Sequence, residues 1–118
     1  MIAYFRILGD TKYLNDLALE LNCSYTIEKT INNDISLKLF EYKEDTLDSN
    51  DLLRKIIDNL SLKIALLNEY RKKYDLEYYF FRVAYLNESN KPILSLDKDV
   101  IEFFYKISAC DDLDYYLC

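Results

Sequence analysis

The sequence predicts an α+β fold, in which a mainly antiparallel sheet carries helices on one face. Apolar residues recur at helical spacing in three segments, and β-branched and aromatic runs typical of strands lie between them. The first six elements, in the order βαββαβ, match a ferredoxin-like unit, and a C-terminal βαβ extends the sheet. Since 118 residues with 51% hydrophobic side chains suffice for one core, we expect a single domain over residues 1–118.

Short apolar patterns define the first three elements. Residues 2–8 are a β-branched and aromatic run that ends at a Gly-Asp turn, and they predict a strand. Residues 11–22 carry a leucine-rich stripe at helical spacing and predict a helix with Asp10 or Thr11 as its N-cap. Weak alternation over residues 24–29 predicts a second strand.

The middle of the chain predicts a turn, a strand and a long helix. The Asn-Asn-Asp cluster at residues 32–34 is typical of a turn. Residues 35–40 alternate between apolar and mixed side chains, so they predict a third strand. After an acidic segment, apolar residues recur at helical spacing up to Tyr74, which predicts one continuous helix capped by Asp48 or Ser49.

The last third predicts a strand followed by a βαβ extension. Residues 76–86 would place aromatic side chains on both faces of a strand, as expected of a strand inside the sheet. Residues 92–96 predict a short strand, and residues 113–117 predict the closing strand. The helix between them begins at an N-cap, Asp97, and presents an apolar stripe of Val100, Ile101, Phe104 and Ile107.

Two absences restrict the chemistry of the chain. Histidine does not occur, so Ser-His-Asp and Cys-His nucleophilic sites and His-ligated zinc cannot form. A single glycine, Gly9, cannot make the phosphate-binding loops that need two or more glycines at fixed spacing. We therefore expect a non-catalytic protein that uses no cofactor.

Charge and cysteine content indicate the partner and the compartment. The formal net charge of −6 disfavours nucleic acids and anionic membranes, whose binding depends on cationic side chains, and favours a basic protein partner. An odd number of cysteines with no CxxC pair predicts that Cys23 and Cys110 are small buried side chains and that Cys118 is a terminal thiol. No signal sequence or long apolar run is present, so we expect a cytoplasmic protein.

An acidic segment is the first candidate site. Residues 41–51 contain five carboxylates, with Lys43 as their one countercharge: Glu41, Glu44, Asp45, Asp48 and Asp51. They could form a surface that mimics a phosphate backbone and occupies the basic active site of a nuclease toxin. The alternative is a solvated loop whose last acids are stabilised at a helix N-terminus by about 0.3–1 kcal/mol each. A second acidic run at residues 111–114 is interpreted as a turn that leads into the last strand.

The second candidate site is a sheet face left open by the helices. We assume that the apolar side chains of the third strand face the helices. The side chains on its other face, together with those of the neighbouring strands, then form an aromatic and cationic surface of Tyr4, Arg6, Lys38, Phe40, Tyr42, Phe80 and Arg82. Such a surface suits a protein interface or the stacking of single-stranded bases. Alternatively, helices cover this face, or a second copy does so in a homodimer.

The pattern resembles a bacterial family known as domain of unknown function 4279. The resemblance rests on a strand running into Gly-Asp, here Phe5-Arg-Ile-Leu-Gly9-Asp10, and on the leucine-rich helix that follows. It also rests on a C-terminal signature of Leu96-Asp97-Lys98-Asp99-Val100-Ile101, Phe103 with Phe104, and Leu113-Asp114-Tyr115-Tyr116. The chain departs from the family where a Pro often follows the first helix and a Trp often occupies the third strand, since Ser24-Tyr25-Thr26 and Phe40 stand there.

The resemblance implies a small bacterial protein of this fold, a kind of module that also turns up beside secreted toxins as a candidate immunity protein. We therefore expect a protein that neutralises a basic toxin domain through residues 41–51. A ligand-binding or single-strand nucleic-acid-binding module that uses the open sheet face is the alternative. A third interpretation is an enzyme that uses Glu41 and Glu44 as paired carboxylates.

Overall fold

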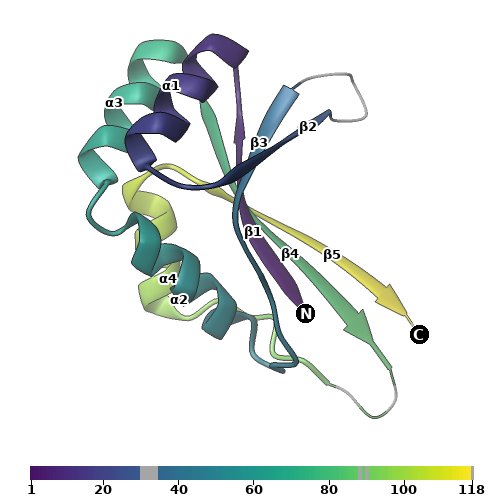
Figure 1. Ribbon diagram of the computed structural model, residues 1–118. Coiled ribbons are helices and arrows are strands. Elements are labelled where there is room, and N and C mark those ends of the chain that lie inside the picture. The colour runs from purple at the N-terminus through teal and green to yellow at the C-terminus, as the bar shows by residue number, and fades with distance from the viewer. Residues whose placement is uncertain (30–34, 88, 90, 118) are drawn as a thin grey trace.

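In the computed structural model, which describes residues 1–29, 35–87, 89 and 91–117, five strands form one sheet (Figure 1). The strands are β1 (Ile2–Leu8), β2 (Tyr25–Lys29), β3 (Ile35–Lys43), β4 (Glu77–Leu86) and β5 (Cys110–Leu117), in the spatial order β2-β3-β1-β4-β5. The helices are α1 (Thr11–Leu21), α2 (Ser49–Leu60), α3 (Ile64–Tyr74) and α4 (Lys98–Lys106). The turn predicted at residues 32–34 and the Cys118 thiol lie outside the described residues.

The sheet confirms the predicted fold class. Strand β3 lies between β1 and β2 and is antiparallel to both, which is the split-βαβ arrangement of the ferredoxin-like unit. Strand β4 adds to the other side of β1 in the antiparallel sense, and β5 then adds parallel to β4. A crossover through α4 makes the parallel connection, as parallel strands require.

The four helices lie on one face of the sheet, as predicted (Figure 1). Helices α1 and α3 pack together over one end of the strands, and α2 and α4 pack together over the other end. No helix of the described residues covers the opposite face, which we call the open face.

Three predicted elements differ from the structure. The closing strand begins at Cys110, so the acidic run interpreted as a turn lies within β5. The single helix predicted to end at Tyr74 is two helices, because the chain leaves the helical path between α2 and α3 and turns α3 towards α1. Leu62 at this break is 95% exposed, so it adds nothing to the apolar stripe. Residues 92–96 do not form a strand, and Ile93 makes only an isolated parallel bridge to Asp48.

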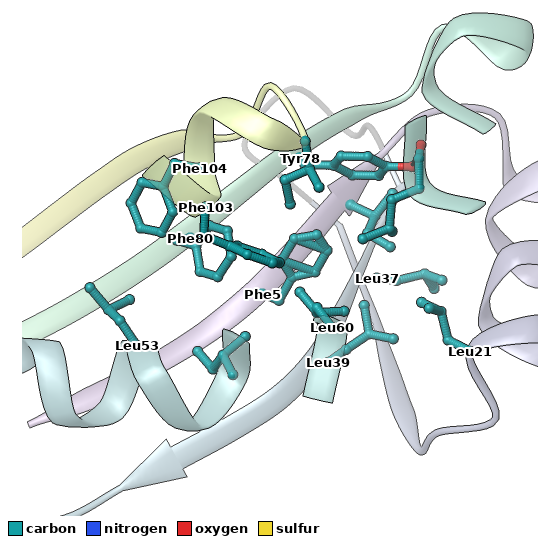
Figure 2. Packing of buried hydrophobic residues seen from close by; sticks show 14 of the residues in the cluster. Phe5, Leu21, Leu37, Leu39, Leu53, Leu60, Tyr78, Phe80, Phe103 and Phe104 are labelled. Carbon is teal, nitrogen blue, oxygen red and sulfur yellow. Dashed lines mark hydrogen bonds between the residues drawn. The ribbon is translucent and has the colours of Figure 1, made fainter. Parts of the chain in front are cut away.

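Aromatic rings from three elements form the centre of the core (Figure 2). Phe80 stacks on Phe104 of α4 at a centroid distance of 4.2 Å and meets the edge of Phe5 from β1 at 5.1 Å. The buried Tyr78 hydroxyl donates a hydrogen bond of 2.7 Å to the Leu67 carbonyl in α3. The helix stripe predicted for α4 is correct except at Ile101, which is half-exposed while Phe103 is buried in its place.

Candidate functional site

The acidic segment predicted at residues 41–51 is divided among different elements. Glu41 belongs to β3, whereas Asp51 lies in the first turn of α2. Asp48 is the N-cap of α2, and its Oδ1 accepts a hydrogen bond of 3.0 Å from the backbone N–H of Asn50. This carboxylate therefore serves the start of the helix, as the alternative interpretation expected of the last acids.

Three of the predicted carboxylates line a shallow hollow beside the first turns of α2. The hollow measures about 550 Å³ and is lined by Glu44, Asp45, Thr46, Asp51, Arg54 and Lys55. Glu44 forms an ion pair with Lys55, and Asp51 accepts a hydrogen bond of 3.1 Å from the Thr46 hydroxyl. Asp45 is exposed, and the described residues contain no ion pair that includes it.

Arg54 connects this hollow to the start of α4. Its Nε and Nη2 donate to the two carboxylate oxygens of Asp99 at 3.1 and 3.0 Å, and Nη2 also donates to Asp97 at 2.5 Å. The Arg54 hydrogen bonds lower the pKa of Asp99 below its usual value. We define the acidic shoulder as the six carboxylates that lie around Arg54 and Lys55: Glu44, Asp45, Asp48, Asp51, Asp97 and Asp99.

Two predictions about these carboxylates are wrong in detail. Asp97 occupies the N-cap position of α4, but its side chain makes no capping hydrogen bond, because it is bound to Arg54. Glu41 lies outside the acidic shoulder, where it pairs with Lys38 at 2.9 Å on the open face. Glu41 and Glu44 therefore do not form the facing carboxylate pair that the hydrolytic interpretation needs.

Arg82, which was predicted on the open face, points to the opposite side of the sheet. Alternation along β4 puts it on the same side as Phe80, where it is 2% exposed. Its Nε and Nη2 donate to the two carboxylate oxygens of Asp111 at 3.0 and 2.6 Å. Its Nη1 donates to the Ser49 hydroxyl at 2.9 Å and to the Leu94 carbonyl at 2.5 Å, so the buried charge has partners on three sides.

Asn50 extends this buried network to the segment before α4. Its Nδ2 donates to Asp48 Oδ1 at 2.8 Å and to the Ser95 carbonyl at 2.9 Å, and its Oδ1 accepts from the Asp97 backbone N–H at 2.9 Å. Residues 92–97 are therefore held by side chains of α2 and β4 rather than by a strand ladder. The network fixes the two halves of the acidic shoulder relative to one another.

Charged side chains cover two aromatic rings at the centre of the open face, those of Tyr4 and Phe81. Tyr4 stacks on Phe81 at 4.9 Å, and the Arg6 guanidinium lies over both rings at 5.3 and 5.2 Å. The Lys38 ammonium lies 5.2 Å from the Tyr4 ring centroid, and Glu28 pairs with Arg6 at 2.9 Å and with Lys38 at 3.0 Å. Although no helix covers it, Tyr4 is only 8% exposed, because the stems of these cations lie across it.

Contacts within the same cluster shift the pKa values of Tyr4 and Glu28. Burial raises the pKa of the Tyr4 hydroxyl, although the Arg6 charge acts in the opposite direction. Burial also raises the pKa of Glu28, but the hydrogen bonds and charges of Lys38 and Arg6 outweigh it and hold the pKa below its usual value. The lowered pKa of Glu28 reflects its two cationic partners, so the charges of this cluster are already paired within the chain.

A bulge in β3 removes two predicted residues from the open face. Phe40 has a backbone φ of 53°, and the register between β1 and β3 shifts between Ala3 and Phe5. The extra residue reverses the alternation, so Tyr42 lies on the helix side, where its hydroxyl oxygen is 2.7 Å from the Asn59 Nδ2 donor. Phe40 packs against the core. The prediction that these two side chains lie on the open face is therefore wrong.

Comparison with known proteins identifies the family. A family model described as a domain of unknown function (DUF4279) matches residues 1–118. The chain belongs to this family. Comparison with curated proteins and with solved structures gives no match.

The second acidic run of this DUF4279 domain is split between the two sides of the sheet. Asp111 lies on the helix side with Arg82, whereas Asp112 and Asp114 alternate onto the open face. The two acidic runs therefore do not form one continuous surface. Cys110 at the start of β5 is exposed and Cys23 is half-buried, so the prediction that Cys110 is buried is wrong.

The residues that the sequence analysis missed are mostly the cations of the DUF4279 site. In the sequence, Arg54 and Lys55 look like ordinary exposed residues of a helix. Their ion-pair partners, Asp97 and Glu44, become visible only in the folded chain. Within the described part of the chain, no group of three or more metal-ligating side chains is arranged to hold a metal ion. None of the helices described there is long and apolar enough to cross a membrane.

Proposed function

We propose that this DUF4279 domain is a non-catalytic binding protein that neutralises a basic, nuclease-type bacterial toxin domain in the cytoplasm. The observation that carries the proposal is the acidic shoulder, which gathers six carboxylates around Arg54 and Lys55. Its excess of acids has the same sign as the formal net charge of −6. A surface of one sign steers an oppositely charged partner and accelerates its association.

The rigidity of the acidic shoulder supports the same proposal. The Arg54 guanidinium holds Asp97 and Asp99, and the buried Asn50 joins the start of α2 to the segment before α4. Carboxylates that are already ordered lose less conformational entropy when a partner binds. Asp45, which has no ion-pair partner among the described residues, is free to accept a Lys or Arg from the toxin.

The alternative of nucleic-acid binding on the open face has less support. Arg6 and Lys38 are both paired with Glu28, so a phosphate would have to displace a carboxylate that the fold already supplies. Arg82, the third cation of that candidate site, faces the helices and is buried. The rings of Tyr4 and Phe81 are stacked on each other rather than presented separately to bases.

Charge reversal on the acidic shoulder tests the proposal. We expect Asp45→Lys with Asp51→Lys to abolish salt-sensitive co-purification of a basic polypeptide from the native cell. The matched control, Asp16→Lys with Glu69→Lys, makes the same charge change on exposed positions of α1 and α3 and should retain the partner. Reversal at Asp51 also opposes the α2 dipole by about 0.3–1 kcal/mol, so thermal unfolding must show that the variant is folded.

Growth measurements complete this test. The recovered polypeptide should be toxic when expressed alone, and co-expression of the wild-type domain or of the control should restore growth. The acidic-shoulder variant should not restore growth. If both variants lose the partner equally, or if the acidic-shoulder variant protects as well as the wild type, the proposal is wrong.

A further inference from the structure

The outer edge of β5 has no partner among the described residues. This strand of eight residues ends the sheet and pairs only with β4. Alternate residues of an edge strand direct their backbone N–H and C=O groups away from the sheet, where another chain can pair with them. The side chains of its second half are also exposed, at 59% for Tyr115, 53% for Tyr116 and 81% for Leu117.

Charges along β5 select the kind of strand that can pair with it. Asp112 and Asp114 lie on the open face, are exposed, and form no ion pair among the described residues. Asp111 is occupied by Arg82 on the other side. The edge has no proline and no bulge, and its exposed charges, Asp112 and Asp114, oppose pairing with acidic strands but attract basic ones.

We propose that the free edge of β5 is a strand-addition site for an extended basic segment of a partner polypeptide. In antiparallel pairing, a cation opposite Asp114 and a second cation two residues later, opposite Asp112, would satisfy both carboxylates. An aromatic or aliphatic residue two positions before the first cation would meet Tyr116 on the same face. The site thus recognises an alternating segment in which an apolar residue precedes two cations.

A second copy of this chain fits the edge less well. Two copies could pair their β5 edges antiparallel about a two-fold axis, with the helices of both copies on the same side of the joined sheet. Residues on the same face of the two strands then lie opposite one another. When the pairing is centred on Asp114, the two Asp114 carboxylates meet, and when it is centred on Leu113, Asp112 meets Asp114 twice. Like charges directly opposite one another destabilise a ladder. A net charge of −6 on each copy adds to this repulsion.

A short synthetic peptide tests the site directly. The probe is Thr-Tyr-Val-Lys-Val-Lys-Thr with blocked ends, titrated into the isotope-labelled full chain and followed by amide chemical shifts. We expect saturable shifts concentrated in β5 and the adjoining part of β4. A peptide with Glu in place of both Lys should bind about tenfold more weakly, because two attractive cross-strand pairs become repulsive.

Two controls separate strand addition from simple charge attraction. Asp112→Lys with Asp114→Lys should reverse the preference, so that the Glu peptide binds more tightly than the Lys peptide. A Lys peptide N-methylated at the alternate amides that face β5 keeps its charges but cannot pair with the edge, and it should not bind.

Several results would overturn the inference. These are shifts confined to the acidic shoulder, equal binding of the Lys and Glu peptides, binding by the N-methylated peptide, no binding at all, or concentration-dependent self-association through β5. The inference does not depend on the proposed function, because Asp112 and Asp114 lie on the open face and the acidic shoulder lies on the helix side. The acidic-shoulder variant, Asp45→Lys with Asp51→Lys, should therefore bind the Lys peptide normally.

Discussion

Arg82 and Asp111 form an ion pair whose partners differ in their access to water. The Arg82 side chain is 3% exposed and the Asp111 side chain is 26% exposed. A charge that loses its partner in the interior remains unsolvated, whereas one near the surface can regain water. The two single substitutions should therefore have unequal costs, although they break the same contact.

We expect Asp111→Asn to lower the free energy of unfolding by about 3–5 kcal/mol, because it leaves the buried guanidinium uncompensated. Arg82→Met should cost less, about 1–3 kcal/mol, since Asp111 can rehydrate and the methionine fills part of the space. Urea unfolding of both variants and of the double variant gives their coupling energy. A larger loss for Arg82→Met than for Asp111→Asn would contradict this account of the pair.

Glu28 contributes to the free energy of unfolding in a way that depends on pH. Its carboxylate is held by Lys38 and Arg6 and has a pKa below the usual value of 4.5. A depressed pKa contributes stability above pH 4.5 that is lost as the pH falls through the folded-state pKa. The contribution is moderate, because the side chain is 31% exposed and solvent screens the pair.

We expect the difference in free energy of unfolding between the wild type and Glu28→Gln to be largest near pH 6. It should shrink steadily as the pH falls below 4.5, because the wild-type carboxylate becomes protonated. Urea unfolding at several pH values measures it, and Glu69→Gln on the exposed side of α3 is the matched control. A difference that stays constant down to pH 3 would mean that Glu28 is not held as described.

At the scale of elements, α1 and α3 end at residues in the left-handed region. Asn22 after α1 has φ 52° and Asp75 after α3 has φ 54°. Glycine is the usual residue at this position, because a Cβ is disfavoured there. The chain uses Asn and Asp instead, the two residue types that tolerate this conformation best.

Asp75→Gly should raise the free energy of unfolding by about 0.5–1 kcal/mol, because it removes the Cβ strain at the end of α3. Asp75→Ala should lower it, since alanine keeps the Cβ and lacks the polar side chain that favours the left-handed region. Thermal unfolding of the two variants measures both effects. Equal stability of the glycine and alanine variants would show that the helix end stores no strain.

Most elements could be predicted from the sequence because their periodicity is local. The bounds of β1 agree with the prediction, and α1 begins where the predicted helix begins. The break between α2 and α3 could not be predicted, because the apolar stripe continues through Leu60, Ile64 and Leu67 with no proline or glycine between them. The sequence also could not show which side chains of β4 face the helices, because Phe80 and Phe81 place an aromatic ring on each face of the strand.

The candidate site was less predictable than the fold. Four of the five predicted acids do belong to the acidic shoulder, because they are close in sequence. Its other members, Asp97 and Asp99, are joined to it through Arg54 and Asn50, by contacts between residues 43 to 47 positions apart. The bulge at Phe40 could not be predicted either, because a bulky residue in the left-handed region has no sequence signal.

At the scale of the whole molecule, one face of the sheet is covered by helices, and the aromatic centre of the other face, Tyr4 and Phe81, is covered by charged side chains. Arg6 and Lys38 lie over Tyr4 and Phe81 and are themselves anchored by Glu28. This arrangement leaves little apolar surface around Tyr4 and Phe81 for a second molecule to bury, whereas Tyr85 and Tyr116 near the end of β4 and β5 are about half-exposed on the same face. The homodimer expected from an uncovered aromatic face is therefore not required to protect the rings of Tyr4 and Phe81.

Arg6→Ala with Lys38→Ala should uncover these rings. We expect more binding of the dye ANS and more self-association in sedimentation velocity than the wild type shows. The variant Arg6→Lys with Lys38→Arg keeps both cations and long stems and should behave like the wild type. Unchanged dye binding in the alanine variant would mean that other side chains protect the aromatic rings.

The central place of β1 has a consequence for how the chain reaches its native state. The first strand pairs with β3 on one side and with β4 on the other, so its ladders close only after the middle and last third of the chain have joined it. Pairings so distant in sequence require large loops to close before any contact is gained, which slows folding. During synthesis on the ribosome, β1 can therefore gain partners on both sides only after β4 has emerged, so the centre of the sheet is completed late.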